Sequence, residues 1–153
     1  MQNWFIKTPA IILFAIFTMV SCKSAQNNDT SGLPKDISER PSDESSQKYD
    51  VAQLDKMKAS IESMVSKEKC TNADDWAFSP LGNKACGGPV SYIAYPKKIE
   101  ETILPIIEEY ASKMSEFNKK YNITSDCMMA AEPTGVKCQA EKAVLIYPYS
   151  ICF

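Results

Sequence analysis

Apolar residues recur at helical spacing in two stretches of the chain. Asp50 and Gln53 form a capping pair at the start of the first stretch, which predicts a helix over about 50–68. Its apolar positions are Val51, Leu54, Met57, Ile61, Met64 and Val65. The apolar residues of the second stretch lie on one face of a helix of roughly six turns. Its positions are Ile99, Ile103, Ile106, Tyr110, Met114, Phe117 and Tyr121. Pro105 either starts this second helix or kinks a longer one.

Shorter runs rich in aromatic and β-branched residues predict strands. They lie at 76–78 and 90–95, and a hairpin follows with arms at 125–131 and 136–147 around a turn at 133–135. The part 143–147 is continuously apolar, which is typical of a buried strand. The predicted order is helix, two strands, helix, two strands. This order favours an α+β fold with two helices packed on one face of an antiparallel sheet of about four strands.

The N-terminus has the pattern of an export signal. Lys7 precedes a run of apolar residues over 10–20, which is shorter than the about 20 residues that a membrane-spanning helix needs. The run fits the apolar region of a secretory signal peptide. Met19-Val20-Ser21-Cys22 then resembles a bacterial lipobox, and this resemblance implies a signal peptide over 1–21 and a lipid on Cys22. An ordinary cleaved signal that contains a cysteine is the alternative.

A polar segment follows over 22–49. Its few apolar side chains cannot offset the entropy of ordering it. We therefore expect a disordered tether that carries the lipid, followed by a single folded domain over 50–153. Arg40 is the only arginine of the chain and lies in this tether.

Charge and composition exclude several classes of function. The 17 Lys and Arg residues nearly balance the 19 Asp and Glu residues, giving a net charge of -2. Proteins that bind nucleic acid show a basic stripe instead. The chain has no histidine, so it lacks the commonest general base, the Ser-His and Cys-His nucleophile pairs and the usual catalytic zinc ligands. We predict no catalytic residues, no cofactor and no metal.

The six cysteines indicate a protein of an oxidising compartment. If Cys22 carries lipid, five remain, which predicts two disulfides and one cysteine left over. A two-residue turn at Thr134-Gly135 would keep Cys127 and Cys138 from facing each other, so longer-range pairs such as Cys86–Cys127 are favoured. The candidates for disulfides are Cys70, Cys86, Cys127, Cys138 and Cys152.

Three cysteine motifs occur in a fixed order. They are Lys84-Ala-Cys86-Gly-Gly-Pro89 with Tyr92 and Tyr95 after it, then Ser125-Asp-Cys127, then Val136-Lys-Cys138. Their order and spacing, over about 70–142, resembles an uncharacterised family of small Cys-rich secreted or lipid-anchored bacterial proteins. The resemblance implies a class of protein and supplies no activity.

The loop formed by Cys86, Gly87, Gly88 and Pro89 is the candidate binding site. It could present backbone N–H groups to an anion or a rigid loop to a protease, and a tight turn fixed by a disulfide is the simpler interpretation. The function predicted is a non-enzymatic binding or structural module, held at a membrane by the lipid on Cys22. Its partner would be an unknown envelope protein, on the periplasmic face or the cell surface. The alternatives are an inhibitor of an exported hydrolase and a thiol-dependent enzyme.

Overall fold

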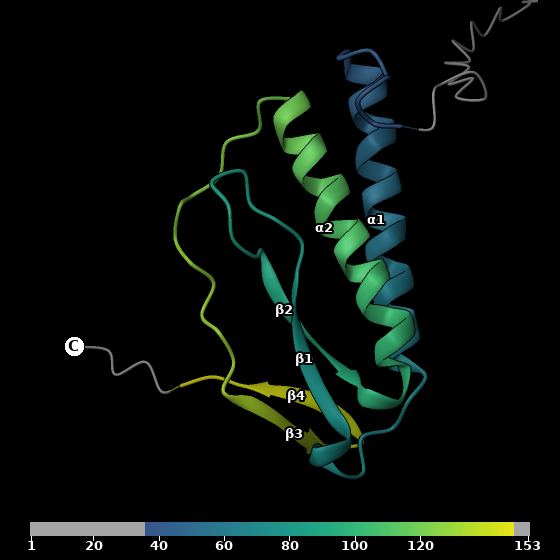
Figure 1. Ribbon diagram of the computed structural model, residues 1–153, viewed down its shortest axis with the longest axis vertical. Helices are drawn as coiled ribbons and strands as arrows, with labels where there is room; N and C mark the ends of the chain where they lie inside the picture. The colour runs from purple at the N-terminus through teal and green to yellow at the C-terminus, as the bar shows by residue number, and fades with distance from the viewer. Residues whose placement is uncertain (1–35, 149–153) are drawn as a thin grey trace, which may run out of the picture.

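The computed structural model describes residues 36–148, which form an α+β fold (Figure 1). Two helices and four strands follow one another in the predicted order: α1 (Glu44–Ser66), β1 (Trp76–Leu81), β2 (Ser91–Pro96), α2 (Glu100–Lys120), β3 (Gly135–Gln139) and β4 (Lys142–Ile146). Two short 3-10 helices, η2 (Ala73–Asp75) and η3 (Lys97–Ile99), precede β1 and α2. The predicted fold class is confirmed.

The helices α1 and α2 run side by side in opposite directions (Figure 1). One face of each helix joins the strands beside it in the main core, whose buried residues are Leu54, Ile61, Leu81, Tyr95, Ile103, Ile107, Tyr110 and Phe117. Ile106, which belonged to the predicted apolar face, is only partly buried, and Ile107 takes its place in the core. Pro105 lies at an exposed position inside α2, and the helix continues through it. Of the two alternatives, Pro105 therefore does not start the helix.

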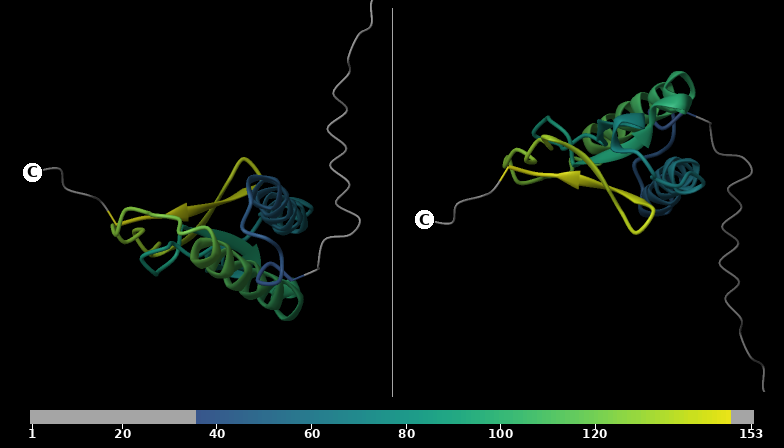
Figure 2. Two further views of the ribbon diagram at one scale, coloured as in Figure 1. Left: turned by 90° about the horizontal axis from the view of Figure 1, so that it is seen from above. Right: turned by 90° about the horizontal axis from the view of Figure 1, so that it is seen from below.

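The four strands form two separate antiparallel sheets, which corrects the single sheet predicted. In the first, Trp76 pairs with Pro96 and Leu81 with Ser91. In the second, the β3–β4 hairpin crosses the lower end of the first sheet, and its closed end lies beside α1 (Figures 1 and 2). A second, smaller core fills this crossing. It contains Cys70, Trp76 and Ala94, with Val65, Val136, Cys138, Ala143 and Leu145 packed against them.

The predicted hairpin turn at 133–135 is wrong. Both arms lie within Gly135–Ile146, and the turn is at Ala140 and Glu141, which have φ angles of 49° and 61°. Two successive positive φ angles are typical of the type I′ turns that join two-stranded hairpins. Asn-Gly is the usual sequence of such turns, so Ala-Glu gives no sequence signal. The expected arm at 125–131 is irregular backbone.

Helix α1 begins six residues before the predicted start at Asp50. Asp43 caps it, since its Oδ1 accepts a hydrogen bond of 2.7 Å from the N–H of Ser46. Residues 36–43 also pack against the fold, and Ile37 is only 4% exposed. Residues 36–49, which the sequence assigned to the tether over 22–49, are therefore part of the folded structure. The predicted signal peptide over 1–21, the predicted lipidation site Cys22 and residues 23–35 lie outside the described residues.

A buried ionic cluster joins this N-terminal segment to both helices. The carboxylate of Asp50, inside α1, is 0% exposed and pairs with the guanidinium of Arg40. It also accepts hydrogen bonds of 3.1 Å from Lys120 Nζ and 2.8 Å from Tyr121 Oη. Lys120 Nζ donates a further bond of 2.6 Å to the carbonyl of Ile37. Three segments that are distant in sequence therefore meet at one carboxylate.

The cluster keeps Lys120 protonated. Burial by itself lowers the pKa of Lys120, but its interactions with Tyr121 and Asp50 outweigh burial, and its pKa is raised above the usual value. Arg40 also stacks over the ring of Tyr49, at 4.9 Å from the ring centre. Two buried cations thus share the single carboxylate of Asp50.

We expect Asp50→Asn to lower the free energy of unfolding by about 3–5 kcal/mol, because it removes the charge that compensates two buried cations. Urea denaturation followed by circular dichroism measures this loss. Asp55→Asn is the matched control, since Asp55 is exposed on the same helix, and should change stability by less than about 0.5 kcal/mol. Equal stability of the two variants would show that the cluster does not hold the fold together.

Candidate binding surface

Two loops that lie far apart in the sequence are joined at one end of the molecule. The loop between β1 and β2 approaches the irregular segment that follows α2 (Figure 1). A disulfide joins them between Cys86 and Cys127, whose Cα atoms are 5.4 Å apart. It is the example given above of the longer-range pairs that the sequence favours, and it bears out the expectation of disulfide bonds. We call residues 84–89 and 125–129 the stapled surface.

Polar contacts also join the two loops of the stapled surface. Lys84 Nζ donates hydrogen bonds of 2.6 Å to Asp126 Oδ1 and 2.7 Å to the carbonyl of Met128. The backbone N–H of Cys86 donates to Ser125 Oγ at 3.2 Å. The hydrogen bond from Lys84 and its positive charge lower the pKa of Asp126. The two loops are therefore fixed by several independent contacts. The opposite charges of Lys84 and Asp126, beside the Cys86–Cys127 disulfide, neutralise each other.

The predicted binding loop is a tight turn. The N–H of Lys84 donates to the carbonyl of Gly88 at 2.9 Å, and the N–H of Gly87 donates to the carbonyl of Lys84 at 3.0 Å. Gly87 and Gly88 have φ angles of 91° and 79°, which favour glycine. Because the N–H groups of Lys84, Cys86 and Gly87 are used within the stapled surface, they do not form the anion site considered from the sequence.

The loop is seated on the C-terminal half of α2. Asn118 Nδ2 donates a hydrogen bond of 2.9 Å to the carbonyl of Asn83, and the N–H of Asn83 lies 3.4 Å from Met114 Sδ. Gly82, with φ of 72°, passes so close to α2 that an added Cβ would lie 2.9 Å from Met114 Sδ. The rigid helix thus sets the position of the stapled surface.

Met128 and Met129 are the most exposed large apolar residues in the described part of the chain, each at 75%. The side chain of Met129 rests over Gly88, where an added Cβ would lie 3.5 Å from its sulfur. Sequence reasoning did not single out this pair, because it falls in a segment predicted to be a strand. Two adjacent methionines next to a cysteine in a polar segment were the available signal.

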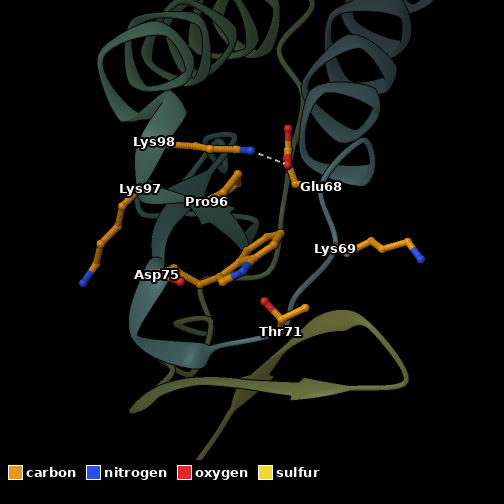
Figure 3. Close-up of a pocket in the computed structure, with 8 residues that line it drawn as sticks. Glu68, Lys69, Thr71, Asp75, Pro96, Lys97 and Lys98 are labelled. Carbon is orange, nitrogen blue, oxygen red and sulfur yellow. Dashed lines mark ion pairs between the residues drawn. The ribbon is translucent and has the colours of Figure 1, made fainter.

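A hollow of about 310 Å³ lies beside Trp76, at the end of the first sheet opposite the stapled surface (Figure 3). Lys98 closes one side through an ion pair of 2.5 Å with Glu68, while Lys69 and Lys97 point away from its centre (Figure 3). Lys69 pairs with Glu141 at 2.9 Å. Because the charges of Lys98 and Lys69 are already paired with Glu68 and Glu141, this hollow is the weaker candidate.

The second disulfide, Cys70–Cys138, lies in the smaller core beneath Trp76, with its Cα atoms 5.2 Å apart. All four cysteines within residues 36–148 are therefore paired. Cys152 lies outside the described residues. Over the same range, no group of three or more His, Cys, Asp or Glu side chains is placed to hold a metal ion.

No helix within residues 36–148 is long and apolar enough to cross a bilayer.

Comparison with protein-family models, with curated proteins and with solved structures finds no match to this chain. The resemblance to small Cys-rich bacterial proteins remains a prediction that rests on the three cysteine motifs.

We expect the Cys86→Ser, Cys127→Ser double variant to lose stability and to mobilise the stapled surface without unfolding the core. The disulfide closes a loop with a sequence separation of 41, which corresponds to about 4 kcal/mol of chain entropy. Hydrogen exchange measured by mass spectrometry should speed up in 84–89 and 125–129, and in the strands it should stay slow.

Cys70→Ser, Cys138→Ser is the matched control. Its loop is also long, with a separation of 68, but Cys70 is buried in the smaller core. Faster exchange should therefore appear around β3 and β4. Unchanged exchange at the stapled surface after loss of Cys86–Cys127 would show that the other contacts hold the loops by themselves.

Proposed function

We propose that this chain is a lipid-anchored protein of the bacterial cell envelope that acts as a non-enzymatic binding module, with the stapled surface as its contact with a partner protein. The observation that carries the proposal is the exposure of Met128 and Met129 at 75% each, on loops that a disulfide and three hydrogen bonds hold in place. Two exposed apolar side chains on a fixed backbone are suited to insertion into a partner.

The rigidity of the surface favours binding. Association costs free energy for each loop that becomes ordered, and loops fixed beforehand avoid that cost. Methionine side chains are flexible and polarizable, so they fill irregular apolar pockets. Since Lys84 and Asp126 neutralise each other, the partner expected is an exported protein with an uncharged apolar groove that admits two adjacent side chains.

Inhibition of an exported hydrolase is a specific version of this proposal. The segment 125–129 is exposed along most of its length and is fixed by Cys127, as a loop that enters an active-site cleft must be. The presented element would then be this segment, with the turn at 86–89 supporting it from behind. This differs from the sequence prediction, in which 86–89 itself was presented.

Export and anchoring rest on different observations. Two disulfides are compatible with an exported protein. The lipid anchor rests on the apolar run and the lipobox-like Met19-Val20-Ser21-Cys22. The chain between Cys22 and Asp36 can span at most about 50 Å when extended, so the folded part would stay close to the membrane that holds the lipid.

Lipidation is tested with Cys22→Ser in the organism that makes the protein. The variant should move from the membrane fraction to the soluble fraction, and the intact mass of the native protein should show acyl chains on a chain that begins at Cys22. Cys152→Ser is the control and should stay in the membrane fraction. A native protein that begins elsewhere and carries no acyl chain would establish the ordinary cleaved signal instead.

The contact surface is tested by affinity capture from an envelope extract. The native protein should recover a stoichiometric partner, and Met128→Ser, Met129→Ser should reduce recovery at least tenfold. Val51→Ser is the control, because Val51 is an exposed apolar residue on α1 at 41%, and should recover the partner as well as the native protein does. Absence of a stoichiometric partner at high protein concentration, or equal recovery by both variants, would contradict the proposal.

A further inference from the structure

The five methionines within residues 36–148 fall into two groups. Met57, Met64 and Met114 are partly buried and pack against the main core. Met128 and Met129 lie outside both cores and are each 75% exposed. Oxidation of a thioether requires that the oxidant reach the sulfur, so the two groups differ in the property that controls this reaction.

We propose that Met128 and Met129 form an oxidation site, at which hydrogen peroxide or a hypohalous acid converts the thioethers to sulfoxides and so switches the stapled surface from apolar to polar. With hydrogen peroxide, the sulfur attacks one peroxide oxygen, an S–O bond forms and the O–O bond breaks. The sulfur loses two electrons, and the peroxide is reduced to water. No further reactant is needed.

The surroundings of the two groups support this selectivity. Met114 Sδ lies 3.4 Å from the backbone nitrogen of Asn83 and would be 2.9 Å from a Cβ added at Gly82, so the loop between β1 and β2 shields part of this partly buried side chain. The sulfur of Met129 lies over Gly88, 3.5 Å from the position of an added Cβ, and the residue is still 75% exposed. The cysteines beside the pair cannot compete for the oxidant as thiols, because Cys86 and Cys127 are already joined in a disulfide.

Oxidation would change the chemistry of the surface while leaving its shape. The disulfide and the bonds of Lys84 to Asp126 and to the carbonyl of Met128 do not involve the methionine sulfurs. A sulfoxide is polar and fits poorly into an apolar groove. This consequence, weaker binding of a partner after oxidation, rests on the proposed function, whereas the oxidation itself does not.

The site is tested on the mature protein, with its disulfides intact, by graded treatment with hydrogen peroxide and mass spectrometry of its peptides. Met128 and Met129 should form sulfoxide at least tenfold faster than Met57, Met64 and Met114. Circular dichroism recorded in parallel shows that the fold persists during the reaction. Equal rates at all five methionines in the folded protein, or slower reaction of the exposed pair, would overturn the proposal.

The switch is tested with Met128→Leu, Met129→Leu, which keeps the surface apolar and cannot be oxidised there. Peroxide should reduce partner recovery from an envelope extract at least fivefold for the native protein and leave the variant unchanged. Equal loss for both proteins would overturn the switch. If no partner is recovered before oxidation, the proposed function fails, and the peptide rates still decide whether the oxidation site exists.

Discussion

The buried carboxylate of Asp50 joins the segment before α1 to the end of α2 that also contacts the loop of the stapled surface. This group holds Arg40 from the segment before α1 and Lys120 from the end of α2, so it fixes how the two helices meet at that end of the molecule. Asn118 is two residues before Lys120 and binds the carbonyl of Asn83. The ionic cluster and the hydrogen bond from Asn118 to the loop therefore both involve the last turn of α2. Loss of the cluster would loosen this turn and, with it, the contact to the loop.

The two disulfides act in different surroundings. Cys70–Cys138 lies in the smaller core, where it ties the chain after α1 to the β3–β4 hairpin. That hairpin has no strand partner in the first sheet, so the disulfide and the apolar contacts around it hold the second sheet in place. Cys86–Cys127 joins two exposed loops that contribute no buried residue to either core. The first disulfide supports the fold, and the second supports the shape of a surface.

The sequence predicted the features that depend on local patterns. Helical periodicity located α2. The preference for longer-range pairs such as Cys86–Cys127 came from a hairpin turn at Thr134-Gly135 that the structure does not have, so that agreement does not rest on a correct local pattern. The start of α1 was missed because residues 44–49 are polar, and their helix is stabilised by the cap at Asp43 and by the distant pairing of Arg40 with Asp50. The β3–β4 turn was missed because Ala140 and Glu141 adopt left-handed conformations that neither residue favours. Long-range charge pairing and backbone strain leave no periodic signal.

The exposed methionine pair was missed for a related reason. Residues 125–131 were predicted as one arm of a hairpin, and an arm that packs on a core buries alternate residues, yet no strand lies beside this segment in the structure. The entropy that a disulfide removes from the unfolded chain depends on the length of the loop it closes. It does not depend on which surface carries the bond. The position of Cys86–Cys127 also matters, because the disulfide fixes the backbone directly before Met128, and Lys84 holds the carbonyl of Met128, at a place where neither core would hold the chain. The Cys86–Cys127 disulfide therefore explains how two large apolar side chains are kept outside the core in a defined place. Both binding and selective oxidation require this property.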